Sequence, residues 1–122
     1  MVKSVVIIAN SAPIGKNSPL EAIRLGSGYM GLGEDVDCKI VFRGDAVLTV
    51  SKTLDPTILG MDSYAEHLEM AELSDLELYV VEEDLNAIGL ESTDLIEYEL
   101  LNVIPLSQVA ELILNADSTF RF

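Results

Sequence analysis

Cysteine and histidine are almost absent from this sequence. Its 122 residues include one cysteine, Cys38, and one histidine, His67. One cysteine cannot form a disulfide within the chain, and this pair cannot supply the four ligands of a Cys/His zinc site. A lone histidine also gives no Ser-His-Asp or Cys-His catalytic arrangement, so we expect His67 to be a surface or half-buried helix residue. We therefore expect neither a metal ion nor a cofactor.

Basic residues are scarce, and no apolar run is long. Lysine and arginine number 7 against 21 aspartate and glutamate residues, which gives a net charge of −14. This charge repels nucleic-acid phosphates and anionic membranes, so we expect neither as a direct partner. No segment approaches the roughly 18 apolar residues of a membrane span, and the start of the chain is too weakly basic for a signal peptide. These absences predict a cytoplasmic protein, whose acidity serves either solubility or attraction to a basic partner.

Aliphatic residues dominate the rest of the chain. Hydrophobic residues make up 49% of the sequence but aromatic residues only 6%, so an aliphatic core is predicted for one domain over residues 1–122. Apolar runs predict strands at residues 2–9, 35–43, 76–81, 100–104 and 119–122, and helical spacing predicts helices that start near residues 18, 61, 82 and 105. This alternation is typical of an α/β fold, with a mostly parallel sheet and helices on both of its faces.

Three details of the predicted helices are specific enough to test. Ser18 suits the N-cap of the first helix. Gly26 and Gly28 leave a small helix face that permits close packing against a strand. Leu85 and Ile88 are predicted to form the buried side of the third helix.

A binding site is expected beyond the carboxyl ends of the strands, where ligands of parallel sheets collect. These ends lead into residues 10–15, 43–45, 81–84 and 105–107. The candidate ligand-binding residues are Asn10, Gly15, Arg43, Asp45 and Glu82.

Each of these candidates also has a plainer interpretation. Arg43 either binds a substrate anion or pairs with an acidic neighbour. The residues from Gly15 to Ser18 either receive an anion at a helix N-terminus or form a capped loop with nothing bound. The acidic run Glu82–Asp84 either complements a helix dipole or binds a metal or acts in acid–base chemistry.

Cys38 lies near the start of the second predicted strand, at the end opposite the expected site. A reactive thiol needs an exposed position near positive charge. In the strand pattern Cys38 points with Ile40 and Phe42. It is therefore either a small buried hydrophobic residue or a reactive thiol.

Four short motifs, taken in order, resemble the DsrE/DsrF-like family and, within it, the TusC/DsrF branch. The segment Ser11–Gly15 is similar to a T-A-P-x-G loop after the first strand, and Phe42–Val47 is similar to a strand ending followed by D-G-V, with Asp-Ala-Val here. Ile104–Leu106 and Phe120–Phe122 also match the branch. The resemblance implies a three-layer α/β/α domain with a five-stranded parallel sheet, assembled into trimers or hexamers. These are homo- or hetero-oligomers with DsrE-like paralogues.

Complexes of this family pass persulfide sulfur, either toward thiolation of the tRNA wobble uridine or within sulfur oxidation. The family's carrier cysteine stands eight residues before the glycine that closes the helix after the third strand. Counted back from Gly89, that position is Val81. Because valine cannot form a persulfide, the resemblance predicts a non-catalytic subunit of a sulfur-relay complex. The alternatives are a sulfur carrier that uses Cys38 and a small-anion or nucleotide-binding module that uses Arg43 and the loop from Asn10.

Overall fold

The structure, a computed structural model, describes residues 4–10, 18–30, 36–52 and 65–122. Its strands are β1 (Ser4–Ala9), β2 (Asp37–Phe42), β3 (Glu77–Val81), β4 (Leu101–Ile104) and β5 (Ser118–Arg121). Its helices are α1 (Ser18–Met30), α2 (Ala65–Leu73), α3 (Glu82–Ala87) and α4 (Leu106–Asn115), and η1 (Gly44–Val50) and η3 (Ser92–Asp94) are 3₁₀ segments. No helix in these ranges is long and apolar enough to cross a membrane.

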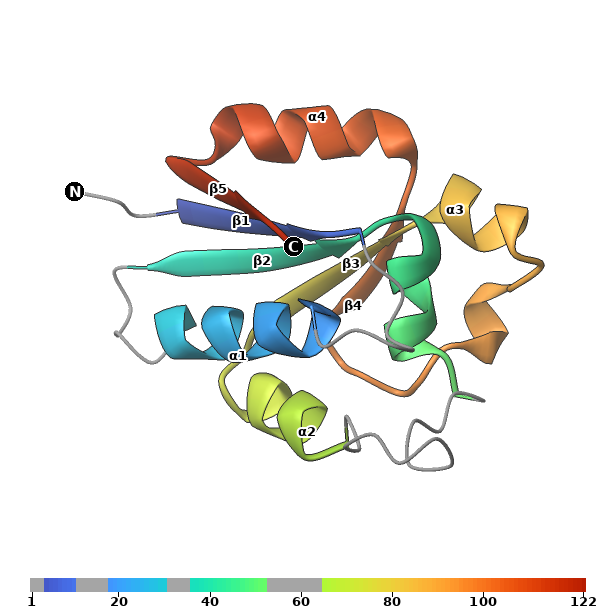
Figure 1. Cartoon of the computed structure of the whole chain (residues 1–122), viewed down its shortest axis with the longest axis horizontal. Coiled ribbons are helices and arrows are strands. Elements are labelled where there is room, and N and C mark those ends of the chain that lie inside the picture. The colour runs from blue at the N-terminus through green and yellow to red at the C-terminus, as the bar shows by residue number, and fades with distance from the viewer. Residues whose placement is uncertain (1–3, 11–17, 31–35, 53–64) are drawn as a thin grey trace.

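The five strands form one parallel sheet in the order β4-β3-β2-β1-β5. The connection through α4 carries the chain from the β4 edge to the β5 edge, and α4 lies on the face opposite α1 and α2 (Figure 1). The predicted α/β architecture with a five-stranded parallel sheet is therefore confirmed. Beyond the carboxyl ends of the strands lie η1 and α3, where parallel sheets collect their ligands.

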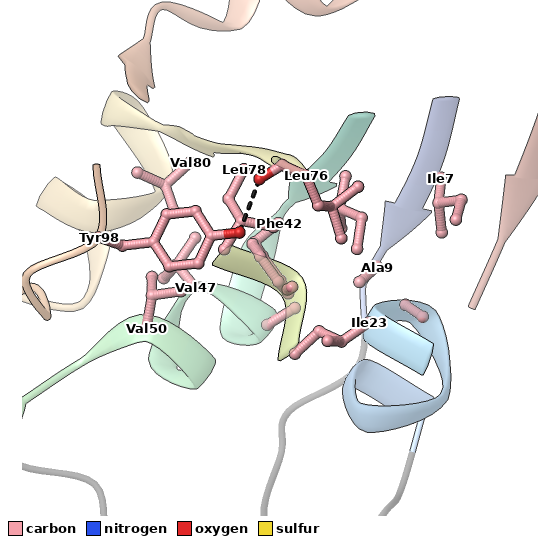
Figure 2. Packing of buried hydrophobic residues seen from close by; sticks show 14 of the residues in the cluster. Ile7, Ala9, Ile23, Phe42, Val47, Val50, Leu76, Leu78, Val80 and Tyr98 are labelled. Atoms are coloured by element: carbon pink, nitrogen blue, oxygen red, sulfur yellow. Dashed lines mark hydrogen bonds between the residues drawn. The ribbon is translucent and has the colours of Figure 1, made fainter. Parts of the chain in front are cut away.

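Two apolar clusters pack against the two faces of the sheet. The larger lies on the face of α1 and α2 (Figure 2), and the smaller lies beneath α4. The consecutive apolar residues of β1 explain why both faces are covered, because Val5 and Ile7 enter the larger cluster while Val6 and Ile8 enter the smaller. Most buried residues are aliphatic, as the composition predicts.

Gly26 allows α1 to approach the sheet closely. A Cβ at this position would lie 3.0 Å from Leu76 Cδ2 and 3.1 Å from Ile40 Cδ1. The space around Gly28 is open, since a Cβ at that position would have no neighbouring atom within 4 Å. The predicted close packing is therefore confirmed for Gly26 and wrong for Gly28, which faces away from the strands and is exposed.

Two other helix predictions have different outcomes. Leu85 is 2% exposed, as predicted, but Ile88 is 36% exposed. The prediction for Ile88 is wrong because α3 ends at Ala87, so the helical spacing that would have buried Ile88 stops before it. The capping role of the Ser18 side chain and the helix start near residue 61 lie outside the described residues.

Candidate functional site at the carboxyl edge of the sheet

The carboxyl ends of three neighbouring strands are held together by backbone hydrogen bonds. The N–H of Arg43, after β2, donates to the C=O of Ala9 at 2.9 Å. The N–H of Asn10, after β1, donates to the C=O of Phe122 at 2.9 Å. Asn10 and Arg43 therefore share one edge, and the parallel pairing of β2 with β3 brings the start of α3 to the same edge, as the strand pattern predicts. We call this region the carboxyl edge.

Arg43 pairs with Asp84 across this edge. Its Nε donates to Asp84 Oδ2 at 3.1 Å, and the two side chains are 33% and 19% exposed. The acidic neighbour proposed for Arg43 in the plainer interpretation is thus present, although it lies 41 residues away in the sequence. The contact uses one donor of a guanidinium that has several, and it is the one ion pair of Arg43 among the described residues.

The acidic run at the start of α3 does not act as one cluster. Asp84 pairs with Arg43, and Glu82 is exposed to solvent. The Glu83 carboxylate accepts the backbone N–H of Leu106 at 3.0 and 3.1 Å. The three carboxylates separate because consecutive helix residues point in different directions. Among the described residues, no three His, Cys, Asp or Glu side chains gather in a way that could hold a metal ion.

Sequence reasoning did not find the role of Glu83. The N-cap residue of α4 is Pro105, which makes no side-chain capping bond. The first amides of a helix lack intrahelical partners, and Glu83 satisfies one of them from a separate element. The proline at the helix start was the available signal, because it shows that the cap must come from elsewhere. Glu83 thereby ties the start of α3 to the start of α4.

Gly44 shapes the turn that follows Arg43. Its φ of 54° lies in the left-handed region that favours glycine, and a Cβ there would lie 3.8 Å from the backbone oxygen of Asn10. Asn10 and Asp45 are exposed beside this turn. Gly15, the remaining candidate of this edge, lies outside the described residues.

Val81 forms part of the floor beneath the carboxyl edge. It ends β3, serves as the N-cap residue of α3 and is 0% exposed. Its cluster partners include Val41 and Ile104. The end of β3 therefore presents a buried aliphatic side chain, which has no nucleophilic atom.

Cys38 lies at the opposite, amino end of the sheet. It pairs in register with Val5, near the start of β1, and is 0% exposed within the larger apolar cluster. Burial, with a further contribution from the negative charge of Asp37, raises the pKa of the Cys38 thiol to about 12. The interpretation of Cys38 as a small buried residue is confirmed. Because a buried, protonated thiol is a poor nucleophile, its environment argues against a carrier role.

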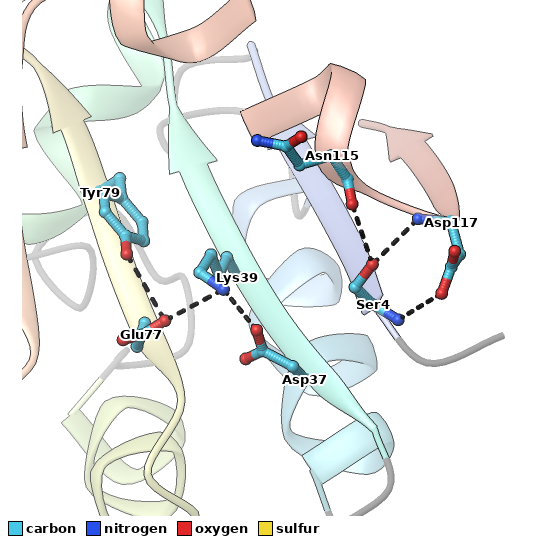
Figure 3. A network of polar contacts seen from close by, with 7 residues as sticks. All are labelled: Ser4, Asp37, Lys39, Glu77, Tyr79, Asn115 and Asp117. Atoms are coloured by element: carbon cyan, nitrogen blue, oxygen red, sulfur yellow. Dashed lines mark hydrogen bonds and ion pairs between the residues drawn. The ribbon is translucent and has the colours of Figure 1, made fainter. Parts of the chain in front are cut away.

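The amino end carries a polar network on the α4 face of the sheet (Figure 3). Lys39 forms ion pairs with Asp37 and with Glu77, the latter at 3.4 Å. Burial lowers the pKa of Lys39, but the hydrogen bonds and charges of its two carboxylate partners raise it more, so the net change is upward. The Lys39 ammonium group is therefore engaged by two carboxylates at the amino end, whereas Arg43 lies at the opposite, carboxyl edge. His67, on α2, is half-buried, as predicted.

Fold and edge together define a parallel α/β domain in which the described part of the carboxyl edge carries an arginine–aspartate pair and no thiol. The model of the DsrE/DsrF-like family matches residues 3–122. The chain therefore belongs to the DsrE/DsrF-like family.

Solved structures share this fold over almost the whole chain. The YchN protein from E. coli superposes with a TM-score of 0.81 at 21% identity, covering 98% of this chain and 99% of that one. MTH1491 from Methanobacterium thermoautotrophicum, described as a protein of unknown function, superposes with a TM-score of 0.73 at 16% identity, with 98% of each chain covered. A comparison with curated proteins finds no match.

Proposed function

We propose that this chain is a non-catalytic subunit of a cytoplasmic sulfur-relay complex of the TusC/DsrF kind. One observation carries the proposal. The end of β3, where the resemblance places the family's carrier cysteine, is Val81, and the single cysteine, Cys38, lies buried at the other end of the sheet. Membership of the DsrE/DsrF-like family supports the sulfur context.

The chemistry of persulfide transfer explains why Val81 changes the role of the chain. A thiolate attacks the outer sulfur of the donor persulfide, a new S–S bond forms, and the donor leaves as a thiolate. Val81 has no atom that can attack, and Cys38 is covered by a core that raises the pKa of its thiol to about 12. The cysteine must therefore come from a partner, which we propose to be a DsrE-like paralogue in a mixed trimer or hexamer.

The remaining features of the carboxyl edge suit a subunit that supports such a partner. Arg43 lies at this edge with its charge partly offset by Asp84, and it is partly open to solvent. A cation in this position stabilises a neighbouring thiolate or persulfide anion. The sulfur so passed serves either thiolation of the tRNA wobble uridine or sulfur oxidation.

Intact-protein mass spectrometry after incubation with a persulfide donor tests the non-catalytic role. We expect the native chain to gain no reductant-sensitive sulfur atom. A reversible gain of one sulfur that disappears in Cys38→Ser would overturn the proposal and make this chain a carrier.

Co-expression with a cysteine-bearing DsrE-like paralogue tests the assembly. Native mass spectrometry is expected to show a mixed oligomer in which only the paralogue carries added sulfur. If the purified chain forms a stable assembly with itself and ignores the paralogue, the proposed partner is wrong.

A second candidate function, a small-anion or nucleotide-binding module, is favoured by the position of the partly exposed Arg43 at the carboxyl edge. Ligand binding to the folded state raises the melting temperature. A screen of nucleotides and sulfur oxyanions against the native chain and Arg43→Gln is the direct test. A shift that requires Arg43 supports this function, and the absence of any shift counts against it.

A further inference from the structure

A hollow of about 400 Å³ lies beside strand β4, between α3, η3 and the sheet. In Figure 1, α3 lies beyond the carboxyl edge of the sheet. We call this hollow the β4 groove. Its lining includes Glu82, Leu85, Leu90, Glu91, Ser92 and Val103.

The floor of the β4 groove is apolar. Leu85 is buried and Leu90 is half-buried, and both belong to or pack against the larger core cluster. Val103 is 39% exposed, which is unusual for a strand residue that has an apolar cluster beside it. The groove therefore offers an apolar contact that the chain leaves open to solvent.

Strand β4 also offers backbone hydrogen-bonding groups. In the part of the chain that the structure describes it is an edge strand, with β3 as its one neighbour in the sheet. The N–H of Leu78, in β3, donates to the C=O of Leu100 at 3.0 Å. Because backbone groups of successive strand residues point to opposite sides, the N–H and C=O of Val103 point away from β3. An added extended segment can pair with such an edge.

The rim of the groove is acidic. Glu82 and Glu91 are exposed, and none of the ion pairs among the described residues involves either of them. The Glu91 side chain also accepts the backbone N–H of Asp94 in the capping box of η3, a bond that glutamine can keep. No lysine or arginine occurs between Lys52 and Arg121, the stretch of sequence that builds the whole groove. The backbone N–H of Lys52 donates to the C=O of Asp94, which places Lys52 beside η3. Within the described ranges, no ion pair involves the Lys52 side chain.

The negative charge of the groove's rim indicates what kind of segment can bind there. A second copy of this chain has a net charge of −14 and would bring further carboxylates to an acidic rim. Like charges brought together at an interface are unfavourable, whereas lysine and arginine side chains match the rim. The apolar floor and the open edge require that the basic residues alternate with apolar ones on an extended backbone.

We propose that the β4 groove docks an extended segment of a different protein, in which basic and apolar residues alternate. The segment pairs with the outward backbone groups of Val103, places apolar side chains over Leu85 and Leu90, and presents its cations to Glu82 and Glu91. This inference stands on the groove itself and holds whether or not the chain takes part in sulfur relay.

The probe for the test is a fluorescein-labelled peptide in which lysine and valine alternate, followed by fluorescence anisotropy on the full chain. We expect saturable binding that weakens as salt is added. The double variant Glu82→Gln/Glu91→Gln should weaken binding about tenfold. The matched control, Glu66→Gln/Glu111→Gln, removes the same charge from exposed positions on α2 and α4 and should leave the affinity unchanged.

A second variant addresses the strand edge. Val103→Pro removes the outward N–H, which edge strands tolerate, and should weaken peptide binding further while circular dichroism stays native. Amide shifts of Leu90 and Val103 should move when the peptide is added. Absence of binding, or equal weakening in the control and the groove variant, would overturn the proposal. If Val103→Pro disturbs the fold, the comparison of the two charge variants still tests whether the peptide binds in the β4 groove.

Discussion

The two ends of the sheet are built in different ways. At the amino end Cys38 is sealed in the core, and Gly26 brings α1 against Leu76 and Ile40. At the carboxyl edge the side chains are polar and partly exposed, and Arg43 and Asp84 form an ion pair across two elements.

This difference separates structure from function within one small domain. Loop connections and the ends of parallel strands are where binding residues collect, while the opposite end is free to be closed by packing. The only thiol of the chain lies at the closed end. Its position separates this cysteine from the edge at which binding residues collect.

The largest expected effect concerns the buried thiol at the amino end. Cys38 should react much more slowly than an exposed thiol. A rise in pKa from 9.0 to about 12 lowers the thiolate fraction at neutral pH by about a thousandfold. Alkylation by iodoacetamide, followed by mass spectrometry, should be slower by at least about that factor in the native chain than in denaturant. Similar rates in the two conditions would show that the amino end opens.

Alkaline pH should destabilise the amino end. Burial raises the pKa of Cys38 to about 12 and also raises the pKa of Tyr98, which donates its hydroxyl to the Leu76 C=O at 2.6 Å (Figure 2). Above pH 9 the unfolded chain therefore loses protons that the folded chain keeps, so stability falls as pH rises toward 12. The slope should be about 1 kcal/mol per pH unit for each group.

Urea unfolding at a series of pH values measures this slope. Cys38→Ala removes one of the titrating groups, so its slope should be shallower than that of the native chain. An unchanged slope would assign the effect to other groups.

Gly26 and Gly28 lie on the same helix, α1, and together they test how closely that helix packs against the sheet. Gly26→Ala should lower the free energy of unfolding by about 1–3 kcal/mol, because its Cβ would crowd Leu76 and Ile40. Gly28→Ala, in open space on the same helix, should raise it by up to about 1 kcal/mol through helix propensity. Chemical denaturation of the two variants gives the comparison, and effects of the same sign would contradict it.

The smallest effect is expected at the carboxyl edge. The Arg43–Asp84 pair is partly exposed to solvent, so it should contribute less than about 1 kcal/mol to stability. A double-mutant cycle with Arg43→Gln and Asp84→Asn measures this coupling. A coupling energy above about 2 kcal/mol would mean that this edge is as much a structural element as the amino end.

Local patterns in the sequence predicted much of the fold. The consecutive apolar residues of β1 predicted a strand covered on both faces, and Gly26 marked a close approach of helix and sheet. The prediction for Ile88 failed because helical spacing does not say where a short helix ends. The candidate site was predicted as a region, since the carboxyl ends of parallel strands share one edge whatever the strand order.

The sequence by itself determined the alternation of strands and helices and the aliphatic character of the core, because period and burial are local properties of the chain. Tertiary structure alone decided that Asp84 is the partner of Arg43 and that Glu83 caps α4. These relations join residues far apart in sequence. They depend on the order and register of the strands, which no local pattern encodes.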